Sequence, residues 1–186
     1  MKGNAKEILK PTLVLVIICL IVTAALAFTN AATKTKIAEQ AESDAKQSRL
    51  IALPGADSFT KSTKAAECYE GKKGSETVGW VFTTKAGSYG GDITVMTGIS
   101  KDGKVTGVQL TSTSDTPGLG LNAQKPEFRN QYVKNCNPGK EFTVVKSGNA
   151  GKSEINAMTG ATISSKAVTK AVNEAVAEFQ KVKGGE

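Results

Sequence analysis

The feature that most constrains this chain is an uncharged stretch near its N-terminus. There is no charged residue between Lys10 and Lys34, and the segment from Thr12 to Phe28 is almost continuously apolar. A helix needs roughly 20 apolar residues to cross a bilayer, so the stretch predicts a transmembrane helix, which we place at residues 12–33. We therefore expect a membrane anchor followed by one globular domain.

The charges ahead of this stretch predict its orientation. Residues 1–11 carry three lysines and one glutamate, and basic residues beside a membrane span favour the cytoplasmic side. We therefore expect residues 1–11 to be a cytoplasmic tail and the domain to lie outside the cytoplasm. A cleaved secretory signal is the alternative, because Ala25-Leu26-Ala27 has the small-x-small form of a cleavage site.

Composition excludes several kinds of chemistry. The chain has no histidine, and its three cysteines are far apart, which excludes histidine-dependent triads, histidine-ligated metals and C-x-x-C redox sites. No metal site is expected. The net charge of +7 comes from scattered lysines, so we expect affinity for lipid headgroups or acidic partners and no nucleic-acid binding. Cys68 and Cys136 can form a disulfide or remain free thiols, and the sequence leaves both open.

The sequence after the anchor indicates a small antiparallel sheet. Residues 31–53 are rich in Ala, Lys, Glu and Gln and predict a helical stalk that ends at Pro54-Gly55. Period-two alternation of apolar residues predicts three strands, at residues 77–84, 93–99 and 104–111. A tight turn at Ser100–Gly103 should join the last two strands, because Asp-Gly accepts the backbone angles of a hairpin turn.

The other segments predict loops and helices around this sheet. The polar run Ser58–Ser75, which carries Cys68 and Tyr69, gives no signal for a particular element, and the glycine-rich run Ala86–Gly91 is expected to break regular structure. Pro126 should open a short helix that carries Phe128, Tyr132 and Val133, and Phe142–Val145 should form a short strand. The carboxylates of Asp92, Asp102 and Asp115 show no paired spacing and are expected to be solvated or to serve turns.

A long amphipathic helix completes the domain. From Val168 to Val182, apolar residues recur every three to four positions, which predicts a helix that packs across the sheet. The expected fold class is α+β, with an N-terminal membrane helix, a stalk or linker at residues 34–60 and a globular domain at residues 61–186.

The segment Ile155–Lys166, directly before this helix, has the composition of an anion site. Its hydroxyls belong to Thr159, Thr162, Ser164 and Ser165. Gly160 allows the backbone to approach a ligand closely, and the unpaired amides of a helix start attract negative charge. An ordinary hydroxyl-rich helix cap is the alternative.

Thr159-Gly160-Ala161-Thr162 also resembles the (Ser/Thr)-Gly-Ala-Thr flavinylation motif of the FMN-binding domain family. This domain is shared by the G subunit of the Rnf complex and the C subunit of the sodium-pumping NADH:quinone oxidoreductase. Ser88–Val95 resembles the family's glycine-rich strand entry, and Asp115–Gly120 resembles its Glu-Thr-Pro-Gly-Leu-Gly loop. The chain departs from the family at Asp115, where glutamate is usual, and at Asn156, where aspartate is common.

The resemblance implies FMN attached covalently through a phosphoester to Thr162. Threonine is a poor nucleophile and no base stands beside it in the sequence, so a separate flavin transferase is implied. The residues expected to bind the flavin are Met158, Thr159, Gly160, Ala161, Thr162, Ser165, Thr116, Pro117, Gly118, Leu119 and Tyr89. For Met158 and Tyr89, core packing is the alternative.

The resemblance further implies an electron carrier in the cytoplasmic membrane of a bacterium. Such a protein would relay electrons between other members of the Rnf complex, which couples reduced ferredoxin and NAD to ion movement, and it would not be catalytic alone. Chain length favours the Rnf protein over its counterpart in the quinone reductase. A pilin-like protein, or an anchored extracytoplasmic binding protein without flavin, is the alternative from another class.

Overall fold

The computed structural model describes residues 5–63, 65, 67–146, 148 and 150–184. Part of the predicted cytoplasmic tail, residues 1–4, lies outside this range. The chain divides into two compact units, residues 1–44 and residues 45–186. Each unit is described by itself below.

The first unit consists of most of helix α1 (Ala5–Ala52). Among the described helices, α1 is the one long and apolar enough to cross a membrane, and its apolar side chains from Ile8 to Phe28 are exposed. Hydroxyls within it are satisfied locally, because Thr12 and Thr29 each donate to the carbonyl one turn earlier. The helix ends before Pro54-Gly55, as predicted.

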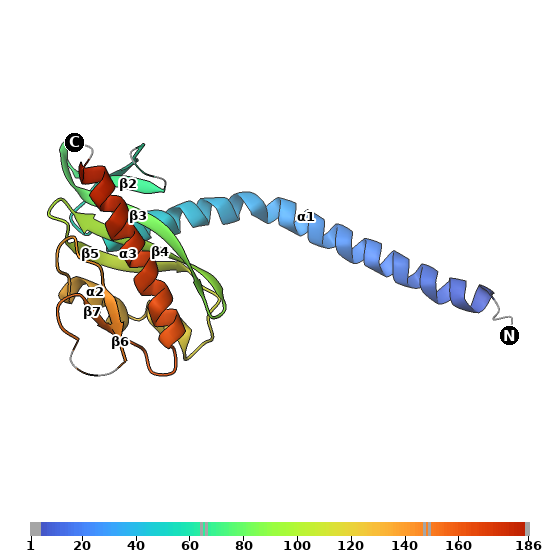
Figure 1. Cartoon of the computed structure of the whole chain (residues 1–186). Coiled ribbons are helices and arrows are strands. Elements are labelled where there is room, and N and C mark those ends of the chain that lie inside the picture. The colour runs from blue at the N-terminus through green and yellow to red at the C-terminus, as the bar shows by residue number, and fades with distance from the viewer. Residues whose placement is uncertain (1–4, 64, 66, 147, 149, 185–186) are drawn as a thin grey trace. The chain divides into compact units, whose positions relative to one another are not determined.

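The second unit is built on a five-stranded antiparallel sheet whose strands follow chain order (Figure 1). The strands are β1 (Ser58–Lys61), β2 (Cys68–Lys73), β3 (Glu76–Ser88), β4 (Gly91–Ser100) and β5 (Val105–Ser112). The three predicted strands correspond to β3, β4 and β5. The predicted turn joins β4 to β5, and Gly103 has the positive φ of 79° that this turn requires.

Two strands were not predicted, and one loop prediction is wrong in part. The polar run 58–75 contains β1, which pairs with β2, and β2, which also pairs with β3. β1 is largely exposed and β2 is mostly half-buried, so backbone pairing rather than apolar alternation defines them. In the run 86–91, residues up to Ser88 stay in β3 because they pair with the start of β4, and the break is confined to the turn at Tyr89 and Gly90.

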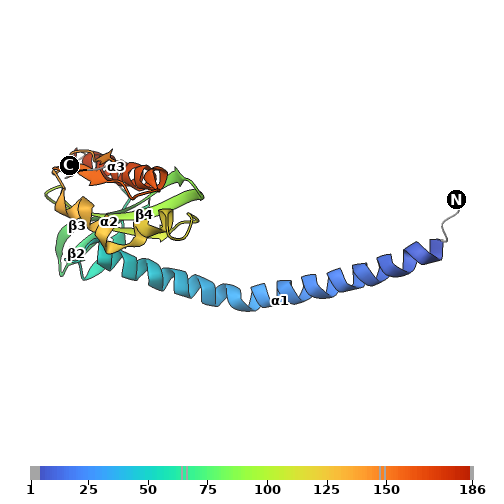
Figure 2. The same ribbon diagram turned by 90° about the horizontal axis from the view of Figure 1, so that it is seen from below.

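Helix α3 (Thr162–Gly184) covers one face of this sheet, against β3 and β4 (Figure 2). Its predicted apolar stripe is buried, with Val172 fully enclosed and the Phe179 ring 5.7 Å from the Trp80 ring. The hydroxyl of Thr84 on β3 donates to the carbonyl of Ala171 at 2.8 Å, which fixes the height of the helix over the strand. The α+β prediction is therefore confirmed.

The last residues of α1, which belong to the second unit, pack on the opposite face. Ala52 and Leu53 are buried there with Val81, whose neighbour Phe82 points into the α3 core. The Thr106 hydroxyl on β5 donates to the Ala52 carbonyl at 2.7 Å. The sheet is thus sandwiched between α3 and the end of α1.

A smaller layer leads into α3. It contains the 3₁₀ helix η1 (Gly120–Gln124), α2 (Pro126–Lys134) and the parallel pair β6 (Thr143–Val145) and β7 (Glu154–Asn156). The helix at Pro126 was predicted, with Phe128 and Tyr132 buried, although Val133 is exposed. β6 begins one residue later than the predicted strand Phe142–Val145. β7 was not predicted, because its backbone is held by side chains of α2 and of the residue that follows it. Gln131 in α2 accepts from the Asn156 N–H at 2.8 Å, and the C-cap Asn135 donates to the Glu154 carbonyl at 2.7 Å.

Cys68 and Cys136 are free thiols. Cys68 is fully buried, and burial raises the pKa of its thiol to about 11, which keeps it protonated. The Cys136 sulfur accepts a hydrogen bond from the Val105 N–H at 3.2 Å. Both cysteines pack as part of the α3 core.

Candidate functional site

The first turn of α3 lines a pocket of about 600 Å³. Three separate segments form the wall: the hairpin between β3 and β4, the loop after β5, and the turn that enters α3. The lining residues are Tyr89, Thr116, Leu119, Gly120, Gly160, Ala161, Thr162, Ile163 and Ser164. All of these described lining residues are uncharged, and the volume is typical of a small-molecule site.

The turn into α3 is locked by Ser165. Its buried hydroxyl accepts from the Met158 N–H at 3.0 Å and donates to the Ala161 carbonyl at 2.9 Å. Gly160 takes a positive φ of 74°, which lets the chain reverse before the helix begins. Thr162 is thereby held as the first residue of α3, half-buried and facing the pocket.

A buried carboxylate joins the walls of the pocket. Asp115 is only 5% exposed, so the expectation that it is solvated is wrong. Its carboxylate accepts from the Ser88 hydroxyl at 2.6 Å and from the Gly90 N–H at 2.7 Å, and it also accepts from the Ser164 hydroxyl. Burial alone would raise the pKa of Asp115, but these three donors outweigh it and hold the pKa below its usual value.

Two glycines allow the walls to approach each other. A Cβ on Gly120 would lie 2.8 Å from Asp115 Oδ2 and would also collide with the Ser164 hydroxyl. A Cβ on Gly160 would lie 3.2 Å from Leu119 Cδ2. A side chain at Gly120 would therefore push the loop away from α3, and one at Gly160 would crowd Leu119 across the pocket.

The structure brings together part of the predicted flavin-binding set. The members that line the pocket are Tyr89, Thr116, Leu119, Gly160, Ala161 and Thr162. Met158 and Thr159 instead line a separate cavity of about 470 Å³ beside α2. Pro117 and Gly118 are exposed in the loop, and Ser165 lies buried behind the turn.

For the two residues with an alternative role, the outcomes differ. Met158 is half-buried against the α3 core, which agrees with core packing. Tyr89 is 73% exposed at the hairpin tip, so core packing is wrong for it. The predicted flavin-binding set omitted Ser88, Gly90, Gly120, Ile163 and Ser164, although each lies inside a segment that the sequence had singled out. Ser88 and Gly90 reach the α3 turn through the sheet, which the sequence pattern did not reveal.

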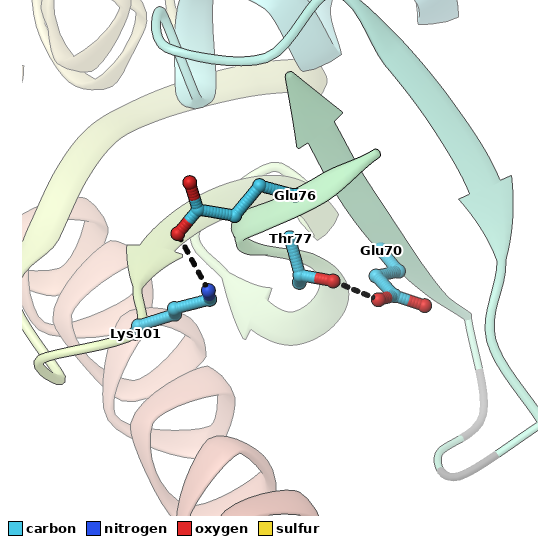
Figure 3. Close-up of polar contacts among 4 residues, drawn as sticks. All are labelled: Glu70, Glu76, Thr77 and Lys101. Atoms are coloured by element: carbon cyan, nitrogen blue, oxygen red, sulfur yellow. Dashed lines mark hydrogen bonds and ion pairs between the residues drawn. The ribbon is translucent and has the colours of Figure 1, made fainter. Parts of the chain in front are cut away.

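A second cavity, of about 550 Å³, has a different character. Its lining includes Lys61, Lys101 and Lys183 together with Glu70. Figure 3 shows two polar contacts beside it: the Lys101 ammonium lies 3.1 Å from the Glu76 carboxylate, and the Thr77 hydroxyl donates to the Glu70 carboxylate. Exposed pairs of this kind contribute little to stability.

Comparison with known proteins identifies the family. The FMN-binding domain model matches residues 88–177, and the model of the RnfG N-terminal region matches residues 1–50. The G subunit of the proton-translocating ferredoxin:NAD(+) oxidoreductase complex of Clostridium ljungdahlii is 40% identical over 135 residues, which covers 73% of this chain and 71% of that protein. The chain belongs to the RnfG family. The G subunit of the Na(+)-translocating complex of Acetobacterium woodii is 34% identical, and the match covers 94% of this chain and 93% of that protein.

Solved structures agree with the fold of this RnfG protein. The C subunit of the Na(+)-translocating NADH-quinone reductase of Parabacteroides distasonis matches with a TM-score of 0.51 at 21% identity, over 62% of this chain and 61% of that chain. NqrC of Shewanella oneidensis matches with a TM-score of 0.51 at 16% identity, over 74% of each chain. This likeness concerns the fold alone. Family membership and the apolar helix α1 make this chain a membrane-anchored RnfG protein with an FMN-binding domain.

Proposed function

We propose that this chain carries FMN as a phosphoester on Thr162 and relays electrons within an ion-translocating ferredoxin:NAD oxidoreductase complex. The relatives' names supply the complex, and the FMN-binding domain supplies the cofactor. The observation that carries the attachment site is the position of Thr162, which begins α3 and lines the pocket where three segments meet.

The residues of the pocket fit a phosphate-bearing aromatic cofactor. The first N–H groups of α3 have no partner within the helix and face an anion favourably, and the helix dipole adds about 0.3–1 kcal/mol at an exposed site. Tyr89, Leu119 and Ile163 provide exposed apolar surface around the pocket. Gly160, which has no Cβ to crowd Leu119, allows the backbone of the turn into α3 to approach a flat ring closely.

Each part of the site has its own task. Bound FMN supplies the electron chemistry, which no side chain of the pocket provides. Thr162 fixes the phosphate in position, the start of α3 stabilises its charge, and Leu119 with Ile163 keeps water from the apolar part of the ligand. Because the described lining residues are uncharged, the pocket offers no general base to activate Thr162, and a separate flavin transferase is needed for attachment.

We also propose the topology of the chain in the membrane. The proposed parts are a cytoplasmic tail at residues 1–11, a membrane span at 12–33, a stalk at 34–60 and an extracytoplasmic FMN domain at 61–186. The lysines of the tail support this orientation. Other Rnf subunits and membrane lipid are the proposed partners. Family membership favours this assignment over a pilin-like or flavin-free binding protein.

Flavin fluorescence on a denaturing gel tests the attachment. The full chain is expressed in membranes with a flavin transferase, and the wild type should give a fluorescent band. Thr162→Val should abolish the band. Thr159→Val is the matched control, because Thr159 lines the separate cavity, and it should only weaken the band. A dark wild-type band, or a bright band from Thr162→Val, contradicts the proposal.

A further inference from the structure

The Asp115 carboxylate connects the three segments of the pocket wall. It stands at the start of the loop after β5, and its partners Ser88 and Gly90 flank Tyr89 in the hairpin. Its third partner, Ser164, lies two residues after Thr162 on α3. Gly120, at the end of the same loop, packs directly against the Asp115 carboxylate.

The hydrogen bonds define the charge of this group. An ionised carboxylate is an acceptor only, whereas a protonated one must also place its own O–H against an acceptor. The Ser88 hydroxyl donates to Oδ2, the Gly90 N–H donates to Oδ1, and the Ser164 hydroxyl donates as well. Three donors converging on one carboxyl fit the ionised form, and the lowered pKa agrees. Asp115 is therefore assigned as a buried negative charge directly behind the wall of the pocket, whose own lining residues are uncharged.

We propose that Asp115 is a positioning residue that assembles the flavin pocket, and that its negative charge holds the reduction potential of the bound FMN low. This inference rests on the proposed function. If FMN occupied the pocket, negative charge gained on its reduction would lie on the side of the wall facing the Asp115 carboxylate, and that carboxylate would make reduction less favourable. Water screens the interaction weakly because the carboxylate is buried.

The test measures the midpoint potential of the flavin in the full, flavin-loaded chain by spectroelectrochemical titration. Asp115→Asn keeps the shape and removes the charge, and it should shift the potential upward. Asp92→Asn is the matched control, because Asp92 is exposed at the start of β4 near the same hairpin, and it should leave the potential unchanged. Asp115→Glu restores the charge and should lie closer to the wild type than Asp115→Asn does.

A purely structural role for Asp115 predicts a different result, in which flavin loading falls but the potential of the loaded fraction equals that of Asp92→Asn. This result overturns the electrostatic part of the proposal. If Asp115→Asn does not accumulate, Ser88→Ala serves as the second test. It keeps the charge but removes a donor that partly neutralises the charge, so the potential should fall. An unchanged or raised flavin potential in Ser88→Ala would also overturn the electrostatic part of the proposal.

Failure of covalent attachment is distinguishable from failure of this inference. In a Thr162→Val background, which is expected to lack FMN, chemical denaturation still reports whether Asp115 holds the three segments together. Asp115→Asn should lower the denaturation midpoint, and Asp92→Asn should not. Equal midpoints for the two variants contradict the positioning role whatever the flavin content of the wild type.

Discussion

Gly98→Ala should weaken the packing of the C-terminal end of α1 against the sheet. Gly98 lies within β4, on the face that receives Ala52. A Cβ at Gly98 would lie 2.5 Å from the Ala52 carbonyl carbon and 2.7 Å from the Thr106 hydroxyl oxygen, and it would also collide with the Ala52 carbonyl oxygen. Two of these atoms belong to the backbone and cannot rotate away, so the end of α1 must move.

The cost follows from the contacts that this movement breaks. Loss of the hydrogen bond from Thr106 to Ala52 costs about 1 kcal/mol. Strain and partial exposure of the buried Leu53 add about 1–3 kcal/mol. Alanine restricts the unfolded chain and returns about 0.5 kcal/mol. The free energy of unfolding should therefore fall by roughly 1.5–3.5 kcal/mol relative to the wild type.

Guanidinium denaturation of the full chain in detergent measures this change, with Trp80, the single tryptophan, as the fluorescent probe. Gly55→Ala is the matched control, because a Cβ at Gly55 would meet no atom within 4 Å. Thr106→Val removes only the hydrogen bond and should cost about 1 kcal/mol. If Gly98→Ala and Gly55→Ala unfold at the same denaturant concentration, the α1 end does not rest on β4 as described.

Three further predictions concern the same domain. Because the pKa of Asp115 is lowered, its carboxylate adds stability above about pH 4, the usual aspartate pKa. This contribution disappears as the pH falls through the lowered pKa. The denaturation midpoint of Asp115→Asn should therefore fall less steeply below pH 4 than that of Asp92→Asn. Val172→Ala should cost about 2 kcal/mol in denaturant titrations, because Val172 is fully buried; a neutral effect would contradict the packing of α3. Lys101→Ala should change the free energy of unfolding by less than about 1 kcal/mol in the same titrations, because its ion pair with Glu76 is exposed. A larger loss would contradict the treatment of this ion pair as a weak surface interaction.

The elements with strong local signals were predicted from the sequence. The apolar stripe of α3, the Asp-Gly turn before β5 and the proline that opens α2 each depend on residues close together in the chain. β1 and β2 were missed because their stability comes from pairing, β1 with β2 and β2 with β3, and most of their own residues are polar. β7 was missed because the amide side chains of Gln131 in α2 and of its C-cap Asn135 hold its backbone.

The parts of the site that are continuous in the sequence were predicted, and the contacts made only by folding were not. The attachment motif and the loop after β5 are continuous segments, so their presence in the sequence was visible. The burial of Asp115 was not visible, because two of its donors, Ser88 and Ser164, lie far from it in the sequence and meet it only when β3 and α3 are assembled. The sequence also did not show that Thr159 and Thr162, only three positions apart, face different cavities.

Peptide mass spectrometry of the mature, membrane-expressed protein tests the central claim most directly. The peptide that contains both Thr159 and Thr162 is isolated after proteolysis, and fragmentation assigns the modified residue. The account predicts a mass increase of one FMN less one water, located on Thr162. An unmodified peptide as the dominant species in the presence of the transferase, or the modification on another residue, would contradict it.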